Sequence, residues 1–321
     1  MALSPFREIR HLDDLAQRLG CESKIIRTFV DAESQLEFYD ELRIPKRRRG
    51  GMFRTVYRVN EAQLMQMHKT IAGTVSSVAV FPECVHGFVR RRSIVTNAKK
   101  HLGQRLLLHA DIKNFFESIT LDQVCSAFVS LGCRSEVAWI LGRLCTLNGF
   151  LPQGVHSSPV LSNLVCRYLD ADLMQLAAAP GCVYTRYADD ITSSGDMIPE
   201  PSNVENILHS HGFHLRDGKC RIQRRGYSQF VTGLSVADPQ RPRCSRKEKK
   251  RLRLILHYAS RYGLEGHLRE ARGHRNTDPD TLYWKLTGKL RFMRYVEPQV
   301  AERMELLLEE ARSKDSEEVS S

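Results

Sequence analysis

Two adjacent aspartates, Asp189 and Asp190, limit the fold of this chain more than any other feature. They lie in the segment CVYTRYADDITSSG, where β-branched and aromatic residues stand on both sides of a short polar tip. Such residues favour strands, so the pattern predicts a strand, a turn and a second strand, with the aspartates at the turn. Neighbouring carboxylates repel each other, and a divalent cation would relieve that repulsion. The plain alternative is a surface turn, where Asp is common.

A third carboxylate, Asp111, ends the apolar run LLLHAD, which has the length and composition of a buried strand. If this strand neighbours the aspartate turn, the three carboxylates meet. Mg²⁺ prefers such oxygen ligands and commonly bridges one or two carboxylates to substrate phosphates. Three carboxylates on adjacent strand ends can hold two metal ions, one for an attacking hydroxyl and one for a leaving pyrophosphate.

The charge of the chain indicates a polyanionic partner. Its 321 residues include 48 Lys and Arg against 37 Asp and Glu, a formal net charge of +11. Basic residues gather in three tracts, at 43–58, 90–105 and 216–253. For any single tract, a solvated surface or a flexible loop is the more common explanation. Three separate tracts favour an extended track for nucleic acid.

Other features exclude whole classes of protein. No apolar run approaches the roughly 18 residues that a membrane span needs, and the start MALSPFREIR carries charge where a signal peptide is apolar. The nine cysteines form no C-x-x-C pair and have no His partners at zinc spacing. We therefore expect a cytoplasmic protein with reduced cysteines and no membrane association.

Periodicity and capping signals predict the remaining elements. A hairpin with a basic tip is expected at 44–60, and Thr120 with Gln123 forms a helix capping box. Helices are predicted at 11–20, 21–39, 120–132, 160–173, from Ser245 onward, at 281–296 and at 298–313. The corresponding regions are a helical lead-in at 1–40, a central region at 41–240, a helical region at 241–313 and a flexible acidic tail at 314–321.

Beyond these local patterns, the sequence resembles the reverse transcriptases. The elements LPQGVHSSPVLSNLV, YADD and FHLRDGKC follow Asp111 in that family's order. The resemblance implies an α+β right-hand polymerase with fingers, a palm of antiparallel sheet plus helices, and a helical thumb. It also implies two Mg²⁺ ions, with Mn²⁺ as the alternative metal. Their ligands would be Asp111, Ile112, Asp189 and Asp190.

The resemblance further implies roles in nucleotide binding and catalysis. Gln153 and Gly154 would lie beside the incoming nucleotide and the template base. Lys219 would act near the pyrophosphate as a catalytic residue. Arg54 best matches the triphosphate-binding arginine, and which cation among Lys46 to Arg49 assists it stays open.

Phe116, five residues after Asp111, has a physical role of its own. Its ring would stack under the nucleotide sugar and clash with a 2′-OH, so we expect it to favour deoxynucleotides. Ordinary core packing is the alternative, and the adjacent Phe115 is the better candidate for that.

Two further segments narrow the resemblance to retron reverse transcriptases, namely NAKKH at 97–101 and VTGL at 231–234, together with the TRYADD setting. This group implies dNTP substrates and a structured non-coding RNA as template and primer. Synthesis would begin at a guanosine 2′-OH and give RNA-linked single-stranded DNA (msDNA), in anti-phage defence with a separate effector protein. The RNA-binding residues would be Asn97, His101, Val231, Thr232, Gly233, Arg246, Lys247, Lys249 and Lys250.

Three alternatives compete with this interpretation. A group II intron-like reverse transcriptase would be expected to carry a maturase or endonuclease region after the thumb. A non-catalytic RNA-binding scaffold with a polymerase fold would be expected to have lost a carboxylate or the Gln-Gly pair. A nucleotide cyclase would need a Gly-Gly-rich hairpin tip and leaves the basic tracts unexplained.

Overall fold

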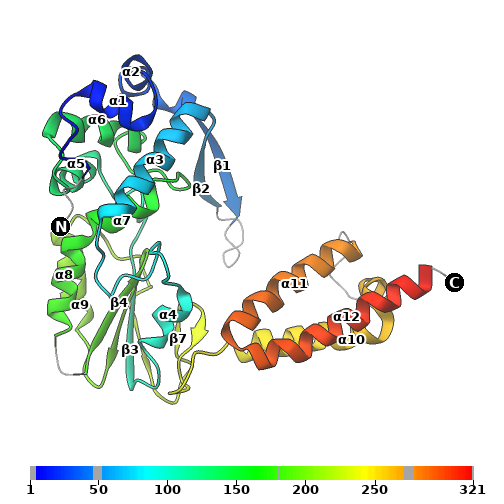
Figure 1. The fold of residues 1–321 in the computed structure, drawn as a ribbon. Helices are drawn as coiled ribbons and strands as arrows, with labels where there is room; N and C mark the ends of the chain where they lie inside the picture. The colour runs from blue at the N-terminus through cyan, green and yellow to red at the C-terminus, as the bar shows by residue number, and fades with distance from the viewer. Residues whose placement is uncertain (1–4, 46–52, 179–180, 271–277, 320–321) are drawn as a thin grey trace. The chain divides into compact units, whose positions relative to one another are not determined.

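The computed structural model describes residues 5–45, 53–178, 181–270 and 278–319. The chain divides into two compact units (Figure 1). Unit 1 comprises Met1–Ser93 and Arg105–Arg224, and unit 2 comprises Ile94–Gln104 and Arg225–Ser321. The division therefore falls earlier than the boundary expected at 240/241, because the segment after Arg225 packs with Ile94–Gln104.

A four-stranded antiparallel sheet forms the centre of unit 1, in the order β4-β5-β3-β6. Its strands are β3 (Leu106–Asp111), β4 (Val183–Tyr187), β5 (Asp190–Gly195) and β6 (Arg221–Arg224). The predicted strand, turn and strand is β4 with β5, joined by Ala188 and Asp189. The predicted apolar strand is β3, and it pairs with β5. Both predictions are confirmed.

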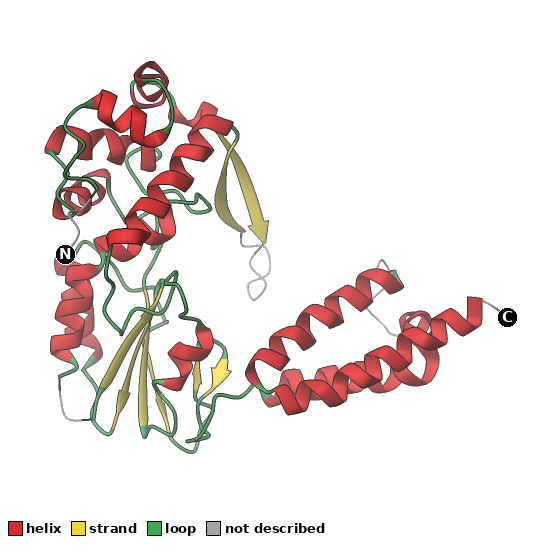
Figure 2. Cartoon of the chain, viewed as in Figure 1, coloured by secondary structure: helices red, strands yellow, loops and turns green. Residues whose placement is uncertain are grey.

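Helices account for most of the rest of unit 1 (Figure 2). They are α1 (Leu12–Leu19), α2 (Ser23–Val30), α3 (Ala62–Val78), α5 (Leu121–Ser130), α6 (Ser135–Cys145), α7 (Ser158–Val165), α8 (Arg167–Leu176) and α9 (Pro201–Ser210). Buried side chains of these helices and of the sheet share one hydrophobic core. The predicted capping box begins α5, since Gln123 N donates to Thr120 Oγ1 (3.3 Å) and Thr120 N to Gln123 Oε1 (2.9 Å).

Two helix predictions in unit 1 were wrong in length. The helix expected at 21–39 ends at Val30, and the short 3₁₀ helix η1 (Gln35–Phe38) follows. The chain folds back there because Phe38 packs edge-on against Phe29, with ring centroids 4.9 Å apart. The single helix expected at 160–173 is two helices, α7 and α8, which meet at Cys166.

The predicted hairpin is β1 (Tyr39–Pro45) with β2 (Phe53–Val59), paired antiparallel from Tyr39↔Val59 to Pro45↔Phe53. Lys46 to Arg49, proposed as triphosphate partners, lie outside the described residues.

Unit 2 contains the short helix α4 (Ile94–Lys99) and the small hairpin of β7 (Phe230–Val231) and β8 (Leu234–Ser235). Three long helices follow: α10 (Arg246–Glu270), α11 (Pro279–Val296) and α12 (Pro298–Val319). Their apolar faces pack together through Leu252, Leu256, Ala259, Leu282, Leu286, Leu290, Met304 and Leu308. The helices predicted from Ser245 onward, at 281–296 and at 298–313 are therefore confirmed.

The tail expected to be flexible from residue 314 is instead helical as far as Val319. Its Asp315 carboxylate accepts hydrogen bonds from Leu264 N (3.0 Å) and Glu265 N (3.2 Å), where α10 breaks at Gly263 (φ 72°). The carboxylate thus satisfies backbone donors at the start of a new helical stretch, as an N-cap does. These hydrogen bonds explain why the helix α12 continues past residue 313 to include Asp315.

Within the described ranges, none of the helices combines the length and apolar composition that crossing a bilayer requires.

A fully buried histidine in unit 1 makes stability depend on pH. His68 Nδ1 lies 2.8 Å from Ser157 Oγ, and Nε2 lies 3.3 Å from Tyr39 Oη. Burial lowers the pKa of His68 from 6.5 to about 3, so the folded state keeps the ring neutral. The unfolded chain takes up its proton near pH 6.5. The stabilisation is therefore present above pH 6.5 and is lost as the pH falls.

Because of His68, we expect the free energy of unfolding to be about 2 kcal/mol lower at pH 5 than at pH 7. Urea denaturation at both pH values measures this loss. His68→Gln keeps a polar side chain but no titration, so its stability should fall less over the same range. Equal losses in the two proteins would contradict the assignment.

Candidate active site

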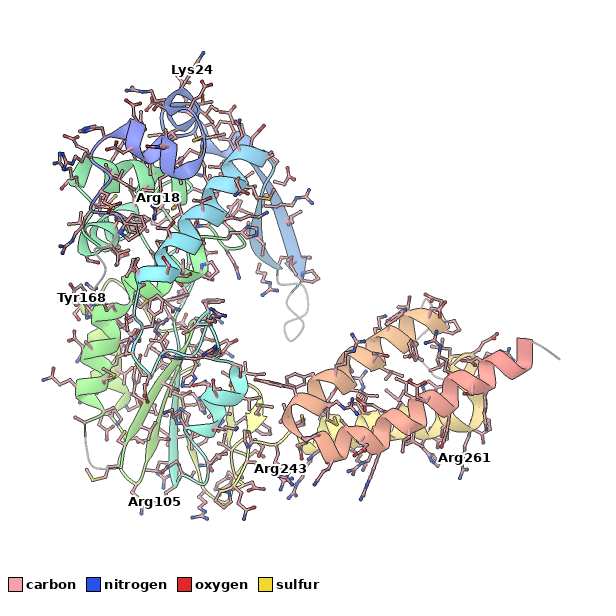
Figure 3. The ribbon with its side chains drawn as sticks, in the orientation of Figure 1. Arg18, Lys24, Arg105, Tyr168, Arg243 and Arg261 are labelled. Carbon is pink, nitrogen blue, oxygen red and sulfur yellow. The ribbon has the colours of Figure 1, made fainter. Side chains whose placement is uncertain are left out.

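The structure brings the three predicted aspartates to one end of the sheet. Asp111 is the last residue of β3, and its register partner is Asp190, the first residue of β5. Asp189 precedes it in the turn. Arg105, just before β3, lies at the opposite end of that strand (Figure 3). Antiparallel pairing therefore places carboxylates from distant parts of the sequence side by side.

Arg216 lies between two of these carboxylates. Its Nη1 donates to Asp111 Oδ2 at 3.0 Å, and its Nη2 lies 3.8 Å from Asp189 Oδ2. The backbone N of Arg216 also donates to Asp111 O (2.8 Å). Sequence reasoning missed this residue, although it stands three positions before Lys219 in the third basic tract. Its guanidinium partly offsets the repulsion between the acids.

The remaining charges still disfavour ionised aspartates. Although Asp190 is exposed as a residue, the surrounding protein reduces solvation of its carboxylate. This loss, together with repulsion from Asp189 and Asp111, raises the pKa of Asp190 to about 6. Burial likewise raises the pKa of Asp189. Lys219 and Arg216 oppose both shifts, so Lys219 stands near the same carboxylates.

The residues at this end of the sheet fit Mg²⁺ in kind. Carboxylate oxygens are its preferred protein ligands, and the guanidinium of Arg216 shows that a positive group is favoured here. Among the described residues, however, no three His, Cys, Asp or Glu side chains are already grouped as a metal site. The Ile112 side chain is fully buried and its N donates to Asp189 O (3.0 Å). Ile112 therefore has only a carbonyl oxygen to offer.

A cleft of about 900 Å³ opens beside Asp189. Three of the residues predicted to bind nucleotide, Arg54, Phe116 and Gln153, line it together with Asp189 and Arg216. Residues from separate stretches of sequence thus meet at one cavity. Its size is within the usual range of small-molecule pockets, about 300–1,000 Å³.

The two adjacent phenylalanines differ in burial, and Phe115 is the core residue as predicted. Phe115 is buried in the core, whereas Phe116 is half-buried and lines the cleft. Their ring centroids are 5.3 Å apart, with Phe116 edge-on to Phe115. The core residue therefore fixes the position of the ring that faces the cleft.

Gly154 is not among the residues lining the cleft, and the structure gives it a different reason to be glycine. It has a φ of 104°, and a Cβ there would overlap the Val56 side chain and the Tyr57 carbonyl. Tyr57 N donates to Gln153 O (2.8 Å) beside it. The glycine lets the loop approach β2 closely, and this approach positions Gln153.

A buried network supports the aspartate turn from inside the unit. Arg186 is fully buried and donates from Nε and Nη2 to the two carboxylate oxygens of Asp170, both at 2.7 Å. Tyr184 Oη donates to the same carboxylate (2.8 Å). Arg186 Nη1 also donates to Asn163 Oδ1 (3.1 Å) and to Ala188 O (3.2 Å). One buried guanidinium thus connects α7 and α8 to the turn.

The turn is constrained from a second direction by Gly87. Ala188 has a φ of 56°, which is costly for a residue with a side chain. A Cβ on Gly87 would overlap the Ala188 amide, so the two backbones lie in close contact. Asn163 Nδ2 donates to Gly87 O (2.8 Å) and holds that segment in place.

Comparison with known proteins decides the family. The reverse transcriptase (RNA-dependent DNA polymerase) family matches residues 44–251. The retron Mx65 reverse transcriptase of Myxococcus xanthus is 33% identical over 317 residues, which cover 91% of this chain and 70% of that protein. This chain belongs to the retron reverse transcriptases. It is accordingly an RNA-directed DNA polymerase by class.

Two other retron reverse transcriptases are similar over shorter parts. The Ec86 enzyme of Escherichia coli is 33% identical over 176 residues, 54% of this chain and 55% of that protein. The Mx162 enzyme of Myxococcus xanthus is 30% identical over 291 residues, 78% and 59% of the two chains. A reverse transcriptase domain implies a right-hand polymerase fold, and the mixture of helices and antiparallel sheets agrees with it.

The two segments that resemble retron elements pack together in unit 2. Helix α4 contacts both β7 and β8, and Thr232 Oγ1 donates to Ile94 O (3.0 Å). Thr232 and Gly233 form the hairpin turn with φ values of 46° and 82°, as a type I′ turn requires. The NAKKH and VTGL segments of this retron enzyme are therefore one substructure.

The predicted RNA-binding residues differ in accessibility. Asn97, His101 and Val231 are buried, so their evident role is packing, and their direct contact with RNA stays a prediction. On α10, Lys249 Nζ pairs with Glu297 Oε1 (3.0 Å).

The other three predicted cations on α10 are exposed. Arg246, Lys247 and Lys250 have no ion pair within the part of the chain that the structure describes. These three cations are therefore accessible to a ligand at the start of α10, as the nearby Arg251 and Arg253 are.

Proposed function

We propose that this enzyme copies part of a cognate structured non-coding RNA into RNA-linked single-stranded DNA. Synthesis would start from a guanosine 2′-OH of that RNA. The observation that carries the proposal is the single cleft in which Arg54, Phe116 and Gln153 meet Asp189. Membership of the retron family supplies the class of template and product. In this proposal the four-stranded sheet is the palm, β1–β2 belongs to the fingers and α10–α12 form the thumb.

The residues of the cleft divide the work of nucleotidyl transfer. Arg54 would bind the triphosphate, and Gln153 would lie against the base pair. Arg216 and Lys219 would neutralise charge on the phosphates as pyrophosphate leaves. Phosphoryl-type transfer depends mainly on positioning and electrostatics, and a cleft lined by fixed cations supplies both.

Two Mg²⁺ ions, or Mn²⁺ in their place, would be held by Asp111, Asp189, Asp190 and the carbonyl oxygen of Ile112. When bound, the metal lowers the pKa of the attacking hydroxyl and stabilises the leaving group. Before that, Arg216 keeps Asp111 and Asp189 close in spite of their charges. The three aspartates thus lie at one end of the sheet, although their side chains are not grouped as a metal site among the described residues.

Phe116 gives a direct test of sugar selection. We expect Phe116→Ala to raise ribonucleotide incorporation relative to deoxynucleotide by roughly 10-fold, since a steric clash of this kind discriminates at about that level. Single-nucleotide extension with rNTP and dNTP measures the ratio. Phe150→Ala, which removes an exposed ring outside the cleft, is the matched control. Unchanged selectivity would leave Phe116 a packing residue.

The proposed partners follow from the retron family. They are the cognate RNA as template and primer, dNTPs, the msDNA product and a separate effector protein. The setting would be anti-phage defence in the cytoplasm. A group II intron-like enzyme is the alternative, and it would extend primers annealed to many templates.

Nucleic acid copurified with the protein tests the proposed function. We expect RNA-linked single-stranded DNA in which the DNA begins at a 2′ branch on a guanosine. Sequencing of both strands, before and after enzymatic debranching, identifies that junction. Linear DNA alone would support the intron-like alternative. No DNA synthesis with any RNA would support a non-catalytic scaffold.

A further inference from the structure

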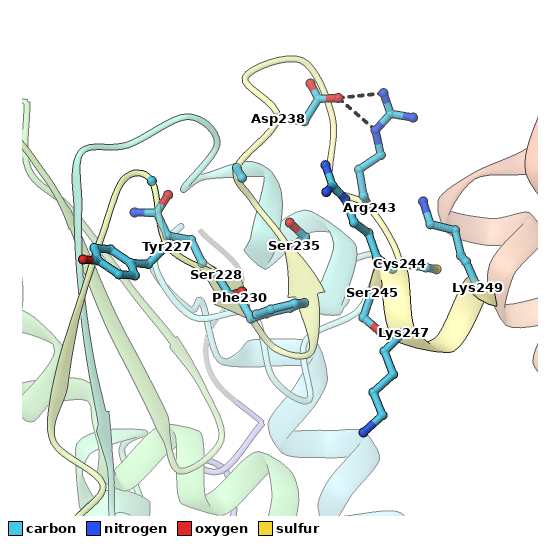
Figure 4. Close-up of a pocket in the computed structure, with 14 residues that line it drawn as sticks. Tyr227, Ser228, Phe230, Ser235, Asp238, Arg243, Cys244, Ser245, Lys247 and Lys249 are labelled. Atoms are coloured by element: carbon cyan, nitrogen blue, oxygen red, sulfur yellow. Dashed lines mark hydrogen bonds and ion pairs between the residues drawn. The ribbon is translucent and has the colours of Figure 1, made fainter. Parts of the chain in front are cut away.

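A second concave site lies within unit 2, where the β7–β8 hairpin meets the start of α10 (Figure 4). It has a volume of about 690 Å³. Tyr227 and Phe230 come from the strand side, and Lys247 and Lys249 come from α10. Four cations and one acid are among its lining residues: Arg243, Arg246, Lys247, Lys249 and Asp238. The site is therefore both aromatic and basic.

One wall of this site is fixed by buried ion pairs. The Glu297 side chain is only 1% exposed and accepts from Lys249 Nζ (3.0 Å), Cys244 N (2.8 Å) and Arg243 Nη1 (3.3 Å). Arg243 Nη2 also donates to Asp238 Oδ2 at 2.6 Å, the contact drawn in Figure 4. Because the charges of Arg243 and Lys249 are neutralised by these ion pairs, the two residues form the wall of the site and leave the binding of an anion to other cations.

Two other cations that line the site carry charge that is available to a ligand. Arg246 and Lys247 are exposed, and neither is ion-paired with any residue whose placement is described. Both stand in the first turn of α10, where the helix dipole favours an anion. In Figure 4 the Lys247 side chain extends away from the Arg243–Asp238 pair. A phosphate group is the anion that suits two such cations.

Tyr227 supplies a flat aromatic surface. It is 77% exposed, and its hydroxyl has no hydrogen bond to a described residue. A single exposed aromatic residue is ordinary, but this one lines a cavity of ligand size that two unpaired cations also line. Nucleobases stack on such rings regardless of sequence. An acidic peptide would use the cations and leave the ring without a partner.

We infer that this pocket binds an unpaired stretch of nucleic acid, with one base stacked on Tyr227 and a backbone phosphate at Arg246 and Lys247. The inference rests on the proposed function, since it takes nucleic acid as the partner. The pocket is formed by the segment that runs directly into the VTGL turn, because Phe230 begins β7. The unpaired stretch belongs either to the template RNA or to the DNA product, and the shared chemistry is an unpaired base together with a backbone phosphate.

Fluorescence anisotropy with a short single-stranded RNA, and with DNA of the same sequence, tests the inference. Tyr227→Ala should weaken binding about tenfold, whereas Tyr227→Phe keeps the ring and should bind as the unaltered protein does. Tyr262→Ala removes an exposed ring of α10 outside the pocket and serves as control. An oligonucleotide with abasic positions should bind Tyr227→Ala and the unaltered protein equally.

The phosphate interaction has its own signature in salt dependence. Arg246→Gln with Lys247→Gln should reduce the slope of log affinity against log salt by about 0.7 for each phosphate that the variant no longer neutralises, while Tyr227→Ala leaves the slope unchanged. A larger Tyr227 effect on RNA than on DNA identifies the template as the source, and the reverse identifies the product.

Normal binding by Tyr227→Ala and by the double glutamine variant would overturn the inference. So would tight binding of an acidic peptide that displaces neither oligonucleotide. DNA synthesis by the unaltered protein is measured separately, so a failed pocket is distinguishable from a failed proposed function.

Discussion

Replacing Asp189 and Asp190 together by asparagine is expected to lower DNA synthesis roughly 1,000-fold or more. Asparagine keeps the size of each side chain but removes the charge that would hold Mg²⁺ and position the attacking hydroxyl. Burial raises the pKa of both carboxylates, and repulsion from Asp189 and Asp111 raises that of Asp190 further, so their charges are unfavourable in the folded protein. The variant should therefore fold at least as stably as the unaltered chain. Primer extension on an RNA template with Mg²⁺, alongside thermal unfolding, measures both effects.

A matched control is available on the same hairpin. Asp196, just after β5, pairs with Arg105 at 3.7 Å, and its side chain is 85% exposed. Asp196→Asn should leave extension unchanged, because exposed ion pairs contribute little and this one is at the far end of the sheet. Extension by the Asp189 and Asp190 double variant at the normal rate would remove the metal assignment.

The second large effect is expected at the buried network behind the turn. Arg186→Met leaves Asp170 charged and unpaired in the interior, which typically costs about 3–5 kcal/mol. A triple variant, Asp170→Leu with Tyr184→Phe and Arg186→Met, removes every charge and the hydroxyl that shares the acid. Replacing a buried pair by apolar residues is often neutral in stability. We therefore expect thermal stability to recover in the triple variant.

DNA synthesis should not recover with it. The Ala188 carbonyl no longer has its donor, so the turn that carries Asp189 is held less firmly. Since a small displacement at a catalytic group can cost about 100-fold, extension should stay low while the unfolding temperature returns. Extension by the triple variant at the full rate would show that the network serves stability alone. The Asp196→Asn protein again supplies the reference rate.

Local signals made much of the fold predictable. The aspartate turn and the Thr120 cap each depend only on residues that are close together in the sequence, and both are present in the structure. The meeting of Asp111 with Asp190 followed from assuming neighbouring strands. Helix lengths were less predictable, because the end of α2 depends on how Phe38 packs and the end of α12 on a partner 51 residues away.

The two arginines that complete the site could not be predicted from spacing. Arg216 bonds an acid 105 residues earlier, and the partner of Arg186 lies on a helix 16 residues before it. Neither distance in sequence marks a contact in space. Likewise, Asn97 and His101 were predicted to contact RNA, but both are buried, and their spacing does not indicate that α4 packs against the β7–β8 hairpin.

The close approach of Gly87 to Ala188 has a consequence for how mutations in this enzyme would be interpreted. Any side chain at 87 would overlap the Ala188 backbone and force the aspartate turn or the Gly87 segment to shift, although the residue has no chemical group to offer a substrate. A survey of inactivating substitutions would then find position 87 as sensitive to replacement as Asp189 or Asp190. Loss of activity at a site lacking functional groups would here report backbone clearance, and only structural measurements on the variant would separate it from lost chemistry.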